Sequence, residues 1–248
     1  LRGGGRERTK EVPFRYVENK PYIHDQKGSL VYYALRDYLG VPFPAPSVPL
    51  DEMPLLAVDI ETTGLDPRVD RVLSIGWVPV DGGSVVLGGA GRVVVRDEVG
   101  GAGGAGVGSS ATIHGLTDDA LAGGEVMADA VARLLGALTG RVLLAHFARI
   151  ETAFLSGACE RLWGAPLPCV VVDTLDLEHR VVTGRGQRDP EPGALRLWSA
   201  RERHGLPVYP AHEALVVALA CAELYRAQRA ELQAARPETT LTLRQVMS

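Results

Sequence analysis

The first half of the chain carries apolar runs that predict strands. Residues 55–60 form a mostly apolar run that leads into turn residues at 62–64, which predicts a buried strand. Residues 70–79 and 84–95 are predicted to form two more strands, and Asp81-Gly82-Gly83 between them is a hairpin signal. Three successive strands of this kind predict an antiparallel meander.

The second half alternates apolar residues at helical spacing with short apolar runs. This order predicts an α/β fold in which a mixed sheet is flanked by helices. Thr117 is expected to begin a helix, and residues 183–193 have the composition of a mobile loop. Helices are predicted over 125–138, 148–163, 195–204 and 211–235, and strands over 141–145 and 170–172.

The ends of the chain differ from its centre. Residues 1–53 are predicted to be an N-terminal extension, with one short helix over 30–39 and a proline-rich strap over 41–54. This helix docks either on its own domain, which is the favoured option, or on a partner. Residues 54–235 are predicted to form the main domain and 236–248 a C-terminal tail. The glycine-alanine run at 100–108 lacks the following Lys-Ser/Thr of a phosphate-binding loop and is interpreted as a flexible loop.

Composition limits the classes of protein that fit. The 248 residues are 46% hydrophobic and 23% charged, which suits one domain of about 180–200 residues plus extensions. No apolar run reaches the length of about 18 residues that a membrane span needs. The net charge of −4 argues against nucleic-acid binding through a broad basic surface. The cysteines at 159, 169 and 221 lack C-x-x-C spacing and are interpreted as reduced core thiols of a cytoplasmic protein, although the chain begins at Leu1, so the absence of a signal peptide is weak evidence.

Asp59 and Glu61 are the first candidates for chemistry. They stand two residues apart at the end of the first predicted strand, so their side chains share one face of the sheet. Two neighbouring carboxylates in a partly buried place repel each other, and a hard divalent cation such as Mg²⁺ or Mn²⁺ relieves that repulsion. The alternative is a pair of solvated carboxylates at a strand end.

Three sequence motifs, in order, carry a resemblance to a known family. Residues 58–66, VDIETTGLD, resemble the first motif of the DEDDh 3′–5′ exonucleases, which include the proofreading epsilon subunit, oligoribonuclease and RNase T. Residues 146–155, HFARIETAFL, resemble the second motif, with Glu151 where the family has aspartate and Phe147 where it has asparagine. Residues 212–218, HEALVVA, resemble the third, H-x-A-x-x-D-A.

The resemblance implies a fold, a reaction and a set of site residues. The fold is a ribonuclease H-like mixed β-sheet flanked by helices. The reaction is metal-dependent hydrolysis of 3′-terminal phosphodiesters of DNA or RNA, which releases nucleoside monophosphates. Asp59, Glu61 and Glu151 would hold two Mg²⁺ or Mn²⁺ ions, and His212 would act as the general base.

Other positions follow from the same resemblance. Five residues would lie along the substrate, namely Thr62, Gly64, Leu65, His114 and His146. Asp173, at the end of a predicted strand, is interpreted as a structural cap for the following helix.

One position departs from the family pattern. Val217 stands where the family has its fourth carboxylate, and valine cannot coordinate a metal ion. Glu213, one helical turn earlier, is a weak candidate for a substitute. The alternative function is therefore an exonuclease-fold module with little or no activity that binds nucleic-acid ends or a protein partner. For the active enzyme the expected partner is single-stranded nucleic acid or a 3′ end, and association with a polymerase stays open.

Overall fold

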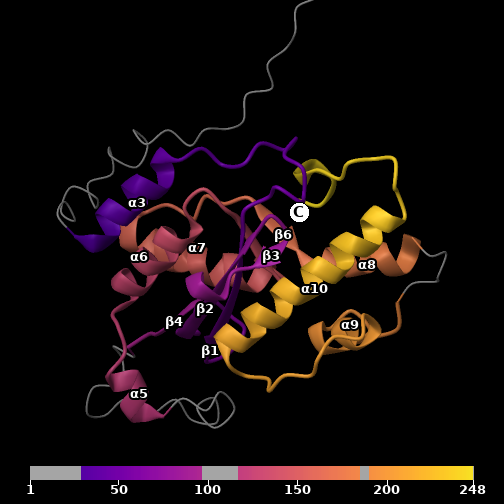
Figure 1. The fold of residues 1–248 in the computed structure, drawn as a ribbon. Helices are drawn as coiled ribbons and strands as arrows, with labels where there is room; N and C mark the ends of the chain where they lie inside the picture. The colour runs from indigo at the N-terminus through magenta and orange to yellow at the C-terminus, as the bar shows by residue number, and fades with distance from the viewer. Residues whose placement is uncertain (1–28, 97–116, 185–189, 248) are drawn as a thin grey trace, which may run out of the picture.

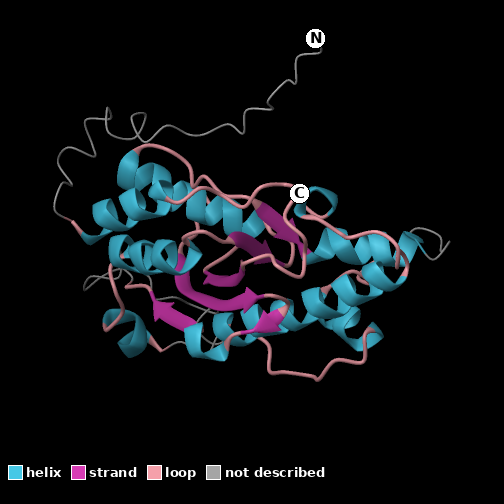
Figure 2. Cartoon of the chain, turned by 45° about the horizontal axis from the view of Figure 1, so that its top comes forward, coloured by secondary structure: helices cyan, strands magenta, loops and turns pink. Residues whose placement is uncertain are grey.

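The computed structural model describes residues 29–96, 117–184 and 190–247, and within them one mixed sheet is enclosed by helices (Figures 1 and 2). The strands are β1 (Leu55–Thr62), β2 (Val72–Asp81), β3 (Ser84–Val85), β4 (Gly91–Val94), β5 (Val142–Ala145) and β6 (Val171–Asp173). The α-helices are α3 (Leu30–Gly40), α5 (Asp118–Ala122), α6 (Met127–Leu138), α7 (Arg149–Trp163), α8 (Thr174–Gly184), α9 (Leu197–Arg203) and α10 (Ala214–Ala234). Among the described helices, none has the length and apolar character that crossing a membrane requires.

The sheet has the strand order β3-β2-β1-β5-β6, and β4 also pairs with β2. β1 and β2 are antiparallel, whereas β1, β5 and β6 run parallel. The predicted opening meander is confirmed, because β2 pairs in antiparallel fashion with β1, β3 and β4. Gly82 and Gly83 turn the hairpin with φ values of 55° and 74°, the left-handed conformation that a tight hairpin of this type needs.

The prediction of one strand over 84–95 is wrong. The segment is divided into β3, a 3-10 turn over Leu87–Gly89 and β4. Two consecutive glycines, Gly88 and Gly89, weaken strand formation there and let the chain turn.

Each face of the sheet carries its own hydrophobic core. Leu56, Val58 and Ile60 of β1 point to the face that packs with α3, α6 and α7. Leu55 and Ala57 point to the opposite face, which packs with α8 and α10. In Figure 1 the first group of helices lies on one side of the strands and α10 runs across the other. Because side chains alternate along β1, Asp59 and Glu61 point to the same face as Leu55 and Ala57, the face that α10 covers.

The helix predicted over residues 30–39 is α3, and it docks on its own domain. Val31, Leu35 and Tyr38 of α3 are buried in the core with α6. The Tyr38 hydroxyl donates a 2.6 Å hydrogen bond to the Pro168 carbonyl.

The strap after α3 and the C-terminal segment lie against each other. Leu50 donates its backbone N–H to the Leu241 carbonyl at 2.9 Å, and Leu243 donates to the Val48 carbonyl at 3.0 Å. Leu241, Leu243 and Val246 are buried in the core beneath α10. Residues 236–247 thus complete the packing of that face.

Helix boundaries differ from the predictions by up to three residues. α10 begins at Ala214 rather than 211, because His212 has φ of +72° and is not helical. α6 begins at Met127 and α9 at Leu197, each two residues after the predicted start. α8 continues to Gly184, so the predicted loop begins inside a helix, and its residues 185–189 lie outside the described part.

Candidate active site

Asp59 and Glu61 lie side by side on β1 and point toward the face covered by α10. Asp59 pairs with Gly76 of β2, and Glu61 pairs with Ser74. Glu61 is only 7% exposed and Asp59 is half-buried. The prediction that the two carboxylates share a face is confirmed by this register.

Gly76 allows α10 to approach the sheet beside Asp59. A Cβ atom at this glycine would lie 2.3 Å from the Ala214 carbonyl carbon and from the Leu215 backbone nitrogen. Any side chain there would collide with the first turn of the helix. Glycine at position 76 therefore brings the start of α10 to the edge of the carboxylate pair.

Glu151 approaches Asp59 from a helix, α7, rather than from the strand. It lies in the first turn of α7, is 4% exposed, and its Oε2 atom has no hydrogen-bond partner among the described residues. Burial raises the pKa of Glu151 to about 8, with a further contribution from the charge of Asp173.

Burial perturbs the two strand carboxylates as well, and neighbouring negative charges add to the effect at Asp59. The pKa of Asp59 is raised well above its usual range, first by burial and then by the negative charges of Glu151 and Glu61. Burial raises the pKa of Glu61 to about 7, although the nearby Arg92 guanidinium opposes this shift. Three acids that interact in this way need a cation or protons to be accommodated together.

Arg92 is a basic neighbour of this cluster that the sequence did not reveal. It lies on β4 directly across Gly76, in the same cross-strand row as Asp59. Its guanidinium is 3.5 Å from the Glu213 carboxylate and lowers the pKa of Glu61. A single basic residue inside a strand gives no local signal, because its neighbours are set by strand pairing.

The third motif surrounds the start of α10. His212 is exposed and precedes the helix, and Glu213 is the N-cap residue. Val217 is half-buried and packs against an apolar cluster that includes Leu197 and Leu224. Val217 is therefore a partly buried apolar residue packed on this cluster, and the Glu213 carboxylate pairs with Arg92.

The turn after β1 is held by a residue that the motif did not single out. Asp70 accepts hydrogen bonds from the Thr63 hydroxyl and the Asp66 backbone N–H, both at 2.9 Å. The Asp70 carboxylate lies so close to Gly64 that a Cβ atom there would be 2.5 Å from one of its oxygens. Leu65 projects from this turn with 76% exposure.

The corner before α7 is fixed by Asp173. Its carboxylate accepts the backbone N–H groups of Phe147, Ala148 and Leu175 at 2.8–2.9 Å. The predicted structural role of Asp173 is confirmed, and it extends to the loop that carries Phe147.

His146 lies beside this corner. Its Nδ1 is 2.9 Å from the Thr174 hydroxyl oxygen. Burial lowers the pKa of His146, while the negative charge of Asp173 opposes that change.

The predicted residues fall into three groups. The structure brings together Asp59, Glu61 and Glu151, with the turn of Thr62 and Gly64 continuing from the same strand. His212 lies at the start of α10, the helix that approaches them. His114 lies outside the described residues, so its predicted role stays a prediction.

The carboxylate cluster fits a divalent cation by its chemistry. Hard carboxylate oxygens suit such ions, and the unpartnered Oε2 of Glu151 is an acceptor that a cation would satisfy. Within the described ranges, no three Asp, Glu, His or Cys side chains are close enough to hold an ion as they stand.

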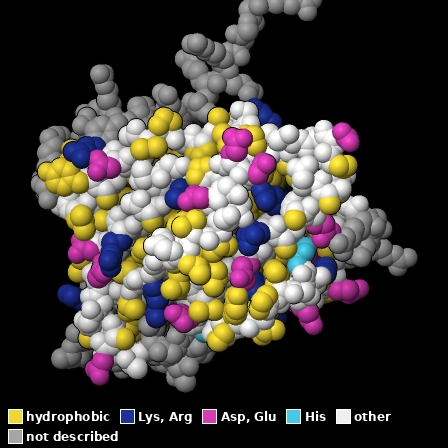
Figure 3. Space-filling view, in the orientation of Figure 1, with side chains coloured by type: hydrophobic (Ala, Val, Ile, Leu, Met, Phe, Trp, Pro, Cys, Tyr) yellow, Lys and Arg dark blue, Asp and Glu magenta, His cyan; other side chains and the backbone are white. Residues whose placement is uncertain are grey.

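The cysteines and the surface charge agree with the composition. Cys159 and Cys221 are buried, Cys169 is half-buried, and all three are free thiols. On the face shown in Figure 3, Lys and Arg side chains are interspersed with Asp and Glu. That face carries no continuous basic patch.

The sequence relatives include two DNA polymerase III proteins. The epsilon subunit of DNA polymerase III from Treponema pallidum is 29% identical over 174 residues, which cover 68% of this chain and 73% of that protein. PolC-type DNA polymerase III from Thermotoga maritima is 27% identical over 175 residues. These residues are 68% of this chain but only 11% of the PolC protein.

Solved structures share the fold. Exonuclease I matches with a TM-score of 0.61 and 18% identity, over 75% of this chain and 42% of that chain. Cell-death related nuclease 4 matches with a TM-score of 0.58 and 13% identity, over 73% and 64% of the two chains. The predicted ribonuclease H-like exonuclease fold is confirmed.

The family is established by a match over most of the domain. A model of the RNase T family, described as exonuclease, matches residues 56–225. Exonucleases of this kind generally use divalent metal ions, and a zinc-bound form of E. coli exonuclease I with single-stranded DNA has been solved. The resemblance carried by the three motifs is therefore confirmed, and the chain belongs to the RNase T family of exonucleases.

Proposed function

We propose that the chain is a metal-dependent 3′–5′ exonuclease that hydrolyses 3′-terminal phosphodiesters of DNA or RNA and releases nucleoside monophosphates. The observation that carries this proposal is the meeting of Asp59, Glu61 and Glu151 from two elements, with raised pKa values and one unpartnered oxygen. A structural role gives no reason to place two buried acids beside the half-buried Asp59, because a buried acid costs free energy unless it is paired.

Asp59, Glu61 and Glu151 would hold Mg²⁺ or Mn²⁺. When bound, such an ion supplies Lewis acidity to the attacking and leaving oxygens. The glutamate at position 151 reaches one methylene further than the family's aspartate. Arg92 adds one positive charge beside these acids and partly balances them.

His212 is proposed to take the proton from the attacking water. Imidazole suits this task because its pKa lies near neutral pH. The side chain is exposed at the start of α10, where substrate and solvent reach it. The turn of Thr62, Gly64 and Leu65 is proposed to contact the terminal nucleotide, with the exposed Leu65 touching its base.

Single-stranded nucleic acid is the proposed partner. Exonuclease I has been solved with dT13 and dA16 oligonucleotides, and the epsilon relative is a polymerase subunit. Whether this chain associates with a polymerase is a separate proposal, since it spans only part of exonuclease I and of PolC.

Val217 supports a second candidate function. With an apolar residue in place of the fourth carboxylate, the chain would bind nucleic-acid ends or a protein partner without cutting efficiently. Glu213 does not supply the missing carboxylate in this structure, because its side chain pairs with Arg92.

One experiment separates the two candidates. Single-stranded DNA and RNA oligonucleotides labelled at the 5′ end are incubated with Mg²⁺ or Mn²⁺ and the native chain, Asp59→Ala, His212→Ala or Val217→Asp. A ladder that shortens from the 3′ end with the native chain, and is lost in both alanine variants, supports the exonuclease. A ladder only with Val217→Asp supports the binding module, and silence in every reaction overturns the assignment of the site.

A further inference from the structure

Phe147 is a departure from the family pattern that the proposed reaction does not use. The family has asparagine at this position, next to the histidine of the second motif. Phe147 is 40% exposed, one of nine large hydrophobic residues that are exposed in the described part of the chain. It precedes α7 by two residues and Glu151 by four.

We propose that Phe147, together with Arg149, forms a stacking platform for a base of the single-stranded substrate beside the carboxylate site. This inference rests on the proposed function, because it assigns a subsite on the same nucleic acid.

The backbone of Phe147 is held in an unfavourable conformation. Its φ is +67°, in the left-handed region that glycine and asparagine adopt much more readily than an aromatic residue does. Asp173 maintains the conformation by accepting the Phe147 N–H at 2.8 Å, and the Phe147 carbonyl accepts from Ile150 at 3.1 Å. With 40% of the residue exposed, part of the burial that could offset this backbone cost is forgone, and asparagine would adopt the conformation at lower cost.

Arg149 adds a cation to the ring. Its guanidinium carbon lies 5.1 Å from the Phe147 ring centroid, a cation–π distance. Arginine beside an exposed aromatic ring is a combination that binds single strands, because the ring stacks on a base and the guanidinium attracts phosphate. A local contact of this kind does not need a broad basic surface, which the net charge of −4 argues against.

The surface beside the ring has room for a nucleotide. Phe147, Arg149 and Thr152 line a hollow of about 400 Å³ together with Val171, Asp173, Leu175 and Asp176. Both Asp173 oxygens are occupied by backbone N–H groups, which reduces their repulsion of phosphate.

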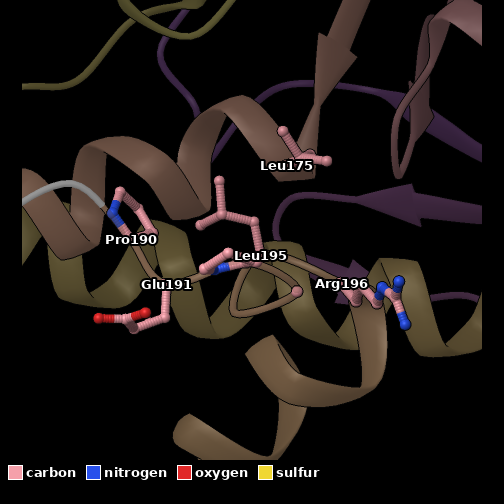
Figure 4. Close-up of a pocket in the computed structure, with 7 residues that line it drawn as sticks. Leu175, Pro190, Glu191, Leu195 and Arg196 are labelled. Atoms are coloured by element: carbon pink, nitrogen blue, oxygen red, sulfur yellow. The ribbon is translucent and has the colours of Figure 1, made fainter.

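A second hollow of about 330 Å³ adjoins the first at Leu175. Figure 4 shows Leu195 between Leu175 and Pro190, with Glu191 and Arg196 toward its two ends. Leu175 lines both hollows, and its backbone N–H donates to Asp173, so both hollows border the corner that presents Phe147. The lining of the second hollow is mainly apolar, with Arg196 and Glu191 as the charged residues, and it extends the surface that adjoins Phe147.

The first test is equilibrium binding of a 5′-labelled dT12 oligonucleotide, followed by fluorescence anisotropy in EDTA so that no hydrolysis occurs. Phe147→Asn restores the family residue and relieves the backbone conformation, so it should fold at least as stably as the native chain yet bind dT12 about fivefold to a hundredfold more weakly. Phe147→Trp should retain affinity, and Arg149→Gln should weaken binding and reduce its salt dependence.

A matched control exists elsewhere on the chain. Tyr33 on α3 is 45% exposed, and the Arg36 guanidinium lies over its ring at 5.1 Å. Tyr33→Asn should leave dT12 affinity unchanged. Equal losses from Tyr33→Asn and Phe147→Asn would overturn the platform, because they would show a nonspecific effect.

Abasic substitution locates the stacked base. Oligonucleotides that lack one base at each of the last four positions are compared on the native chain and Phe147→Asn. At one position the base loss should weaken native binding and have no effect on Phe147→Asn. If the loss from a missing base adds to the loss from Phe147→Asn at all four positions, stacking on Phe147 is refuted. Failure of the proposed function would be seen separately, as a native chain that binds the oligonucleotide but does not hydrolyse it.

Discussion

Adding one methyl group at Gly76 is expected to push α10 away from the sheet. In Gly76→Ala the new Cβ would lie 2.3 Å from backbone atoms of Ala214 and Leu215, and ordinary van der Waals contact begins at 3.4 Å. Backbone cannot rotate away as a flexible side chain does, so the first turn of α10 or strand β2 has to move. The movement loosens the core that Ala218 and Cys221 form with the sheet.

Overpacking of this kind costs about 1–3 kcal/mol of unfolding free energy, and each kcal/mol lowers Tm by about 2–4 °C in a domain of this size. Urea unfolding and thermal melts measure it. Gly136→Ala in α6 is the matched control, because nothing lies within 4 Å of its added Cβ, and it should stabilise by about 0.5–1 kcal/mol. If Gly76→Ala is as stable as the native chain, or if both variants lose stability equally, the close approach of α10 is refuted.

Three further predictions follow from the charged groups. In EDTA, the unfolding free energy should fall as pH rises from about 4.5 to about 8. The reason is that Glu61 and Glu151, with pKa values of about 7 and about 8, keep protons in the folded state that the unfolded chain releases. Urea melts across this pH range measure the change, and a flat profile would contradict the prediction. Asp173→Ala removes the acceptor of three backbone N–H groups and should lower the unfolding free energy by about 2–5 kcal/mol, measured by urea unfolding. Asp173→Asn keeps one acceptor oxygen and should lose less stability. Equal losses in the two variants would argue against the hydrogen bonds. Arg92→Gln removes the cation that lowers the pKa of Glu61, so the pH dependence of Mn²⁺ uptake, measured by calorimetry, should shift to higher pH. Arg92→Lys keeps the charge and should shift this pH dependence less. An unchanged pH profile in Arg92→Gln would exclude the role of Arg92.

The parts of the site that depend on local pattern were predictable. Strand alternation alone places Asp59 and Glu61 on one face, and the strand-to-helix boundary at Asp173 indicates its capping role. Both inferences use residues only a few positions apart, where backbone geometry is fixed by the element. The family resemblance supplied Glu151 and His212, which lie far along the chain from β1.

The parts that depend on pairing between distant segments were not predictable. Arg92 reaches the carboxylates only because β4 pairs with β2 opposite Gly76. The same register makes Gly76 a contact point for α10, although its sequence context is that of an ordinary strand glycine.

Backbone conformation accounts for other differences. The positive φ of His212 delays the start of α10, and nothing in the apolar run after it indicates that delay. The strained Phe147 was visible only as an unusual residue in a motif, and its exposure and its contact with Arg149 required the structure.

The central claim is tested most directly by the identity of the product. The native chain and Asp59→Asn are incubated with Mn²⁺ and a single-stranded oligonucleotide that has either a free or a blocked 3′ end, and released nucleotides are measured by chromatography. The account predicts nucleoside monophosphates from the free 3′ end with the native chain, and none from the blocked end or with Asp59→Asn. Release that is equal from blocked and free ends, or that persists in Asp59→Asn, would contradict a 3′–5′ exonuclease built on this carboxylate cluster.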